Sequence, residues 1–260
     1  MKIKFFSVLS LALFTVVSGC GSKKESEAPL PATVAPPSVA VSKTLDRSTL
    51  GNLKGVVKFE GAVPATREIP VKGNPECAVF HSGGTIRSEE LLVKDGVLQN
   101  AFVYIKEGLE GYQFDVPQEA VTVSNKNCVY VPHVSGVRAG QPLILSNEDP
   151  TLHNIHAYSK NSPAFNLGLP FQGIKQTKKF SSPEVMVTLK CDVHPWMIGY
   201  VGVLPHPYFA VTGEEGTFEL KDLPPGEYTV EVWHEKLGTQ SQKIQIGPRE
   251  TKETEFKFSA

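Results

Sequence analysis

The sequence predicts an all-β protein, because short runs with a period of two recur along the chain and turn residues separate them. Apolar and polar side chains alternate in residues 53–60, 185–192 and 218–232, as they do in strands that bury one face. Glycine and proline are frequent, with 22 and 20 copies in 260 residues, which suits a turn-rich protein. No convincing long amphipathic helix interrupts the pattern. We therefore expect β-sandwich architecture.

The first twenty residues have the form of an export signal. Lys2 and Lys4 precede an apolar run at 5–17, which is too short to span a bilayer as a helix. Residues 17–20 read Val-Ser-Gly-Cys, which resembles the lipobox of bacterial lipoproteins and implies that Cys20 is acylated. A plain signal peptide is the alternative. The residue after Cys20 is not Asp, so we expect a lipid-anchored periplasmic protein at the outer rather than the inner membrane.

Two further properties narrow the function. Residues 21–50 lack periodic apolar positions and are rich in Ser, Pro, Ala and Lys, which predicts a flexible linker. The formal net charge of -1 gives no reason to expect nucleic acid as a partner. The sequence has no zinc-protease motif, nucleophile elbow or phosphate-binding glycine loop, so we expect that the protein is not an enzyme.

The most informative segment is the loop 191–197, which carries a thiol, an imidazole and a thioether. Cys191 shares the face of its predicted strand with aliphatic side chains, so it should point inward. A second imidazole, His153, follows a predicted strand upstream. One soft thiolate, two imidazoles and a weak axial thioether select copper for electron transfer, whereas zinc would have no use for a Met. We predict one type 1 copper site, formed by this loop and a histidine of the upstream segment.

Two segments, 140–156 and 185–203, resemble the cupredoxin family, and the second has the Cys-x-x-His-Pro-aromatic-Met loop of its amicyanin branch. The resemblance implies a copper-binding β-sandwich over about 113–205. It implies the ligands His153, Cys191, His194 and Met197, and it makes Asn154 a residue that ties the two ligand loops together by hydrogen bonds. His156 matches a position of the family that does not bind the metal.

The same resemblance implies how the protein works. It places His194 at the protein surface within an apolar patch, next to Trp196, as the exit for the electron. Single electrons would then pass between the copper and a redox partner, such as a cytochrome or an oxidoreductase. Two alternatives remain open. One is copper storage or delivery, and the other is a surface lipoprotein that binds carbohydrate or protein and has an ancillary copper site.

A second resemblance concerns the rest of the chain. Residues 209–228 resemble the carboxypeptidase regulatory-like family of small β-sandwiches and the related rhamnogalacturonan-lyase accessory domain. That family opens with strands like those at 55–61 and 100–105, so we expect the copper domain to be inserted in this sandwich or packed on it. The expected organisation is a signal peptide at 1–20, a linker at 21–50, the first part of the regulatory-like sandwich at 51–112, the cupredoxin domain at 113–205 and the remainder of the sandwich at 206–260.

The four cysteines divide among three roles. If Cys20 carries lipid and Cys191 binds metal, then Cys77 and Cys128 are left, and in an oxidising compartment we expect them to form a disulfide. A second metal site made by Cys77 and His81 is the alternative. Three further histidines are unassigned, and a second site would require some of them to cluster: His133, His206 and His234.

Overall fold

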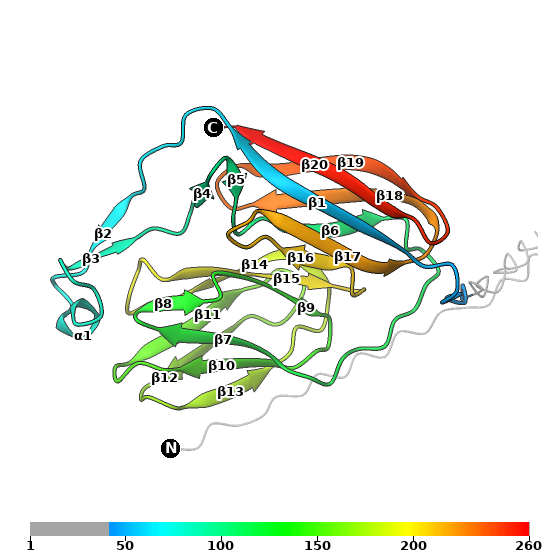
Figure 1. Ribbon diagram of the computed structural model, residues 1–260. Coiled ribbons are helices and arrows are strands. Elements are labelled where there is room, and N and C mark those ends of the chain that lie inside the picture. Colours follow the sequence, from blue (N-terminus) through cyan, green and yellow to red (C-terminus); the bar gives the residue numbers. More distant parts are fainter. Residues whose placement is uncertain (1–41, 260) are drawn as a thin grey trace, which may run out of the picture. The chain divides into compact units, whose positions relative to one another are not determined.

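The computed structural model describes residues 42–259, which lie within one compact unit, Ala40–Ala260. They form twenty strands and one four-residue helix, α1 (Pro75–Ala78), so the all-β prediction is confirmed (Figure 1). The expected signal peptide, Cys20 and most of the expected linker lie outside the described residues. No helix within 42–259 is long and apolar enough to cross a membrane.

One sandwich, which we call the outer sandwich, combines strands from both ends of the described chain. In its first sheet, β1 (Gly51–Glu60) pairs in parallel with β20 (Thr251–Ser259) and antiparallel with β17 (Thr217–Leu223). The short strands β4 (Val93–Lys94) and β5 (Val97–Leu98) extend this sheet. The second sheet has the order β16-β6-β18-β19, with the bounds β6 (Phe102–Glu107), β16 (Phe209–Val211), β18 (Gly226–His234) and β19 (Gly238–Ile246). Apolar side chains of both sheets share one core, which includes Leu53, Val57, Val230 and Phe256.

The inner sandwich is formed by the chain between β6 and β16. One sheet has the order β13-β10-β7-β8, and the other has the order β12-β11-β14-β15-β9. The strands are β7 (Val121–Lys126), β8 (Val129–Val131), β9 (Val134–Arg138), β10 (Leu143–Asn147), β11 (His153–Tyr158), β12 (Phe165–Leu169), β13 (Lys175–Lys178), β14 (Glu184–Lys190) and β15 (Ile198–Leu204). Because β6 and β16 pair with each other, the chain leaves the outer sandwich and returns to it at neighbouring strands.

The alternation predicted before Cys191 holds over most of β14. Val187, Leu189 and Cys191 are all buried in the core of the inner sandwich. Val185 was expected on the same face, but it is 37% exposed. The pairing of β14 with β15 shifts in register between Glu184 and Val187, so the strict period of two does not reach Val185.

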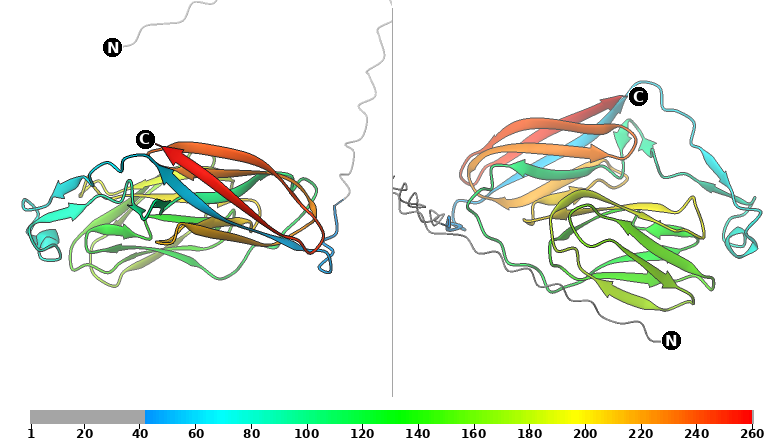
Figure 2. Two further views of the ribbon diagram at one scale, coloured as in Figure 1. Left: turned by 45° about the horizontal axis from the view of Figure 1, so that its top comes forward. Right: turned by 180° about the vertical axis from the view of Figure 1, so that it is seen from behind.

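A hairpin early in the chain packs on the inner sandwich. It consists of β2 (Glu68–Pro70) and β3 (Thr85–Arg87), with α1 in the connection between them. Proline at the first helical position and an acidic residue in the first turn favour helix formation at α1. Val71, Cys77 and Ile86 enter the core of the inner sandwich, although this segment was expected in the first part of the regulatory-like sandwich, 51–112. Figure 2 shows the same hairpin from two further directions.

An aromatic contact joins the two sandwiches. Phe102 of β6 is fully buried in a small cluster with Val134 and Leu204 of the inner sandwich. Its ring fits there because glycines face it. A Cβ atom on Gly202 would lie 2.3 Å from Cζ of Phe102, and one on Gly136 would lie 2.9 Å from Cε2 of Phe102. At this contact the Phe102 ring of the outer sandwich packs directly against the backbone of two glycines of the inner sandwich.

We expect Gly202→Ala to destabilise the protein by about 1–3 kcal/mol, since the added methyl group must displace the Phe102 ring in a packed interface. The measurement is the free energy of unfolding in a denaturant titration. Gly168→Ala is the matched control, because a Cβ atom there meets nothing within 4 Å. Equal stability of the two variants would show that the two sandwiches separate easily at this contact.

Candidate metal centre

Three buried side chains bring donor atoms together in the inner sandwich: His153, Cys191 and His194. Their ligand atoms all lie within 4.8 Å of one another. Nδ1 of His194 is 3.0 Å from Nδ1 of His153 and 3.8 Å from Sγ of Cys191. One thiol sulfur and two imidazole nitrogens of this kind can hold a transition-metal ion that accepts both soft and nitrogen ligands.

Strand ends and one tight loop place these donors. His153 opens β11, and Cys191 directly follows β14, which is antiparallel to β11, so both lie at the same end of the sheet. The loop then turns into β15. It is closed by the N–H of Met197, which donates to the carbonyl of His194 at 2.9 Å, and by the N–H of Cys191, which donates to the carbonyl of Met197 at 3.2 Å. Met197 is 1% exposed and shares the core with Cys191.

A buried carboxylate sets the orientation of the His153 ring. Oδ2 of Asp149 accepts a hydrogen bond from Nε2 of His153 at 3.0 Å, and the carboxylate also accepts from the backbone N–H groups of Asn127 and Cys128 at 2.7 and 2.8 Å. Burial opposes the charge of Asp149, but these hydrogen bonds hold its pKa below the ordinary value. The proton of the ring is thereby assigned to Nε2, which leaves the lone pair of Nδ1 for a metal.

The thiol of Cys191 is prepared for ionisation. Burial alone would raise its pKa, but hydrogen bonds with His153 and His194 and with the backbone N–H of Asn154 outweigh burial and lower the pKa to about 6. A thiol with this pKa is mostly thiolate at neutral pH, and the thiolate is the form that binds metal ions.

Asn154 connects the strand of one ligand to the loop of the others. Its Oδ1 accepts a hydrogen bond from the backbone N–H of Asp192 at 2.7 Å, and its Nδ2 donates to the Asp192 carboxylate at 2.9 Å. The same Nδ2 lies 2.7 Å from Oδ1 of Asn166 on β12. These hydrogen bonds link the two candidate ligand segments, as the cupredoxin resemblance implies for Asn154.

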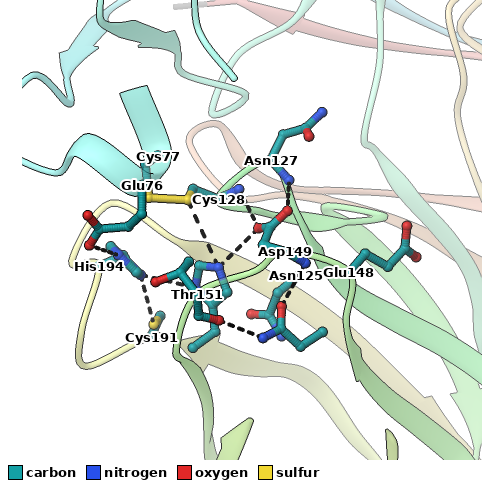
Figure 3. Close-up of polar contacts among 12 residues, drawn as sticks. Glu76, Cys77, Asn125, Asn127, Cys128, Glu148, Asp149, Thr151, Cys191 and His194 are labelled. Carbon is teal, nitrogen blue, oxygen red and sulfur yellow. Dashed lines mark hydrogen bonds and ion pairs between the residues drawn. A yellow bond between two sulfur atoms is a disulfide. The ribbon is translucent and has the colours of Figure 1, made fainter. Parts of the chain in front are cut away.

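A disulfide joins Cys77 and Cys128, as predicted, with 5.7 Å between the Cα atoms. It attaches α1 to the turn between β7 and β8. His81 does not join Cys77 in a metal site, since its Nε2 contacts the backbone carbonyl of Asn127 at 2.8 Å. The disulfide and the neighbouring Glu76 lie over His194, and we call these three residues, Glu76, Cys77 and Cys128, the roof (Figure 3).

The prediction that His194 reaches the surface is wrong, because the roof covers it. His194 is 0% exposed, and Oε1 of Glu76 lies 4.0 Å from its Nε2. Trp196 is only half-buried, but it is fixed from within. Its Nε1 donates to the carbonyl of Cys128 at 3.0 Å, and its ring lies 5.2 Å from that of His194. The ring edge of His194 therefore gives no direct contact with a partner in this conformation.

The other histidines stay apart from this centre. His156 is partly exposed and lies 3.3 Å from Oδ1 of Asp192. His133 contacts Glu235, and Nε2 of His206 donates to the carbonyl of Ile105 at 2.8 Å. His234 accepts from the backbone of the nearby Lys236. Burial lowers the pKa of both His206 and His234 to about 4, so both are neutral at pH 7. Neither belongs to a group of three or more metal-binding side chains within residues 42–259.

The contacts of Asp149 and Glu76 and the position of the disulfide over His194 were not predicted from the sequence. Asp149 lies four residues before His153, and an acidic side chain so close to a predicted histidine ligand is a usable signal for a partner that orients the ring. The sequence around Glu76 gave no such signal. Its contact with His194 depends on how the β2–β3 hairpin folds, and this hairpin precedes His194 by more than a hundred residues.

Comparison with solved structures finds cupredoxins. Amicyanin from Paracoccus versutus is 26% identical, with 34% of this chain and 85% of that chain covered and a TM-score of 0.29. A purple cupredoxin from Nitrosopumilus maritimus is 24% identical, with 34% and 99% covered and a TM-score of 0.28. The copper-containing nitrite reductase NirK from Thermus scotoductus SA-01 is 16% identical, with 59% and 28% covered and a TM-score of 0.32.

These two cupredoxins match only a third of the chain. No protein-family profile and no curated protein matches it. The expected membership of the outer sandwich in the regulatory-like family finds no support in these comparisons and stays a prediction.

Replacement of Asp149 with Ala should weaken metal binding about 10–100-fold, because the His153 ring loses the acceptor that fixes its tautomer. The measurement is a copper titration against a competing chelator. Glu148→Ala is the matched control, since this neighbouring carboxylate is half exposed and pairs with Lys126 rather than with the histidine. If both variants bind as tightly as the original protein, the carboxylate has no role in the site.

Proposed function

We propose that this chain is a copper protein that carries single electrons, with a type 1 centre formed by His153, Cys191, His194 and Met197. The observation that supports this most is the convergence of a low-pKa thiol and two imidazole Nδ1 atoms in a buried core. A thioether from the same loop completes the donor set expected of such a centre. Bound copper would supply a one-electron couple.

The residues of the chain prepare the site for that couple. Cys191 provides the thiolate, and the strand ends of β11 and β14 hold it and His153 in fixed positions. Asp149 keeps Nδ1 of His153 free of a proton, and Asn154 fixes the ligand loop against β11. The surrounding apolar core excludes water. Since the donors are held before metal arrives, little movement is needed when the charge of the site changes.

We infer that the protein acts as an electron carrier rather than an enzyme. The four proposed donors would occupy the coordination positions on the metal, and none would be left open for a substrate. Copper storage is the second candidate. The complete burial of His194 under the roof favours it, since a covered site slows both metal exchange and contact with a partner. Slow loss of copper to a chelator combined with slow electron exchange would indicate storage.

The oxidised, copper-loaded protein should show an intense charge-transfer band in the visible range, because the band arises from the thiolate–copper bond. Cys191→Ser should abolish the band, and Cys20→Ser, which changes a cysteine far from the site in sequence, should keep it. The measurement is the visible absorption spectrum with one equivalent of Cu(II). A folded, colourless copper complex of the original chain would contradict a type 1 centre.

We also propose that the chain is attached to the outer membrane through an acylated Cys20, where a cytochrome or another oxidoreductase would exchange electrons with it. Cell fractionation tests the anchor. The original chain and Cys191→Ser should sediment with membranes and require detergent for release, whereas Cys20→Ser should be recovered in the soluble periplasmic fraction. Recovery of the original chain in the soluble fraction would rule out the anchor.

A further inference from the structure

The roof brings a second set of metal-binding atoms together. The sulfurs of Cys77 and Cys128 and a ring nitrogen of His194 lie within 4.8 Å of one another. All three residues are 0% exposed. Cys128 also lies close to the other histidine of the centre, with its Sγ 4.0 Å from Nε2 of His153. The disulfide thus borders the metal centre directly, as Figure 3 shows for Cys77, Cys128 and His194.

The ring of His194 has one nitrogen that the main centre does not use. Its Nδ1 faces Cys191 and His153. Its Nε2 is buried and has no hydrogen-bond partner among residues 42–259, and the nearest carboxylate oxygen, from Glu76, is 4.0 Å away. A buried polar atom without a partner is unfavourable. Here that atom faces Glu76 of the roof, and a nitrogen of the same ring lies within 4.8 Å of both sulfurs.

We propose that reduction of the Cys77–Cys128 disulfide creates a second metal site for Cu(I), formed by the two thiolates and Nε2 of His194. A dithiol reductant would supply two electrons and two protons, become a disulfide itself and leave two thiols on the chain. When the ion binds, the two thiols and Nε2 of His194 release their protons to solvent, and two copper–sulfur bonds and one copper–nitrogen bond form. Where Nδ1 also holds copper, the His194 ring bridges the two positions as an imidazolate. The site exists only in the reduced protein, because the oxidised sulfurs are bonded to each other.

The donor set favours Cu(I) over other ions. Thiolates are soft ligands that select Cu(I), and two of them with one imidazole satisfy its low coordination number. Zinc would require a fourth ligand, and the carboxylate next to His194 is that of Glu76, which is partly exposed. Access does not require global unfolding. The helix that carries Cys77 has only four residues and is followed by Val79, which is 76% exposed, so local opening of this segment can expose the disulfide.

The test counts bound Cu(I) in full-length chain before and after reduction. Cys20→Ala is used as the background, so that only Cys77, Cys128 and Cys191 can contribute thiols. A phosphine, which takes up the oxygen of one water molecule as it converts the disulfide into two thiols, is removed before the titration. Cu(I) is then added without oxygen against a chromophoric chelator. We expect the reduced chain to bind one Cu(I) more than the oxidised chain.

Three variants distinguish the site from simpler explanations. Cys77→Ser keeps a single thiol in the roof and should lose the additional ion. Cys191→Ser disables the main centre but should keep the additional ion, so failure of the type 1 proposal and failure of this one are separable. His194→Gln should lower the affinity for the additional Cu(I) about tenfold. If the ion were bound only by the thiols of an unfolded chain, its affinity would not depend on this ring.

Two results would overturn the proposal. One is the same Cu(I) count before and after reduction. The other is an additional ion that is retained in Cys77→Ser or bound with unchanged affinity in His194→Gln, since either would place it elsewhere on the chain.

Discussion

The carboxylate of Asp149 is the group on which the candidate metal centre depends. It is 2% exposed and accepts hydrogen bonds from the backbone of Asn127 and Cys128 and from the His153 ring. A buried charge is unfavourable without such partners, and removal of one partner disturbs the others. One carboxylate therefore fixes the turn between β7 and β8, the backbone of the disulfide-bonded Cys128 and the ring of His153, a proposed ligand.

Two acidic side chains flank the His153 ring. The Asp149 carboxylate and the Cys191 thiolate lie on either side of the His153 ring, and burial strengthens each of these interactions because water screens them little. Burial lowers the pKa of His153, but its hydrogen bonds with Asp149 and Cys191 outweigh this and raise it. A metal cation would replace the proton that His153 and Cys191 share in a hydrogen bond. The same electrostatics would thus serve the site with and without its metal.

The parts of the site that could be predicted are those that lie close together in sequence. Cys191, His194 and Met197 share one short loop, and strand alternation shows that Cys191 points inward. The disulfide could be predicted because few cysteines were left. The burial of His194 could not, since it depends on how the β2–β3 hairpin packs against a core formed by later strands. The register shift that exposes Val185 likewise has no local signal in an alternating run.

The parallel pairing of β1 with β20 has a consequence for the order in which the chain can fold. The inner sandwich is built from one continuous stretch, whereas the outer sandwich joins the first and last long strands described. During synthesis or export, the strands of the inner sandwich are complete while β20 is still missing, and domains tend to fold as units when their residues become available. Until β20 arrives, the backbone of β1 has a free edge that can pair with other chains. Final closure of the outer sandwich is therefore the step at which this protein is most exposed to aggregation.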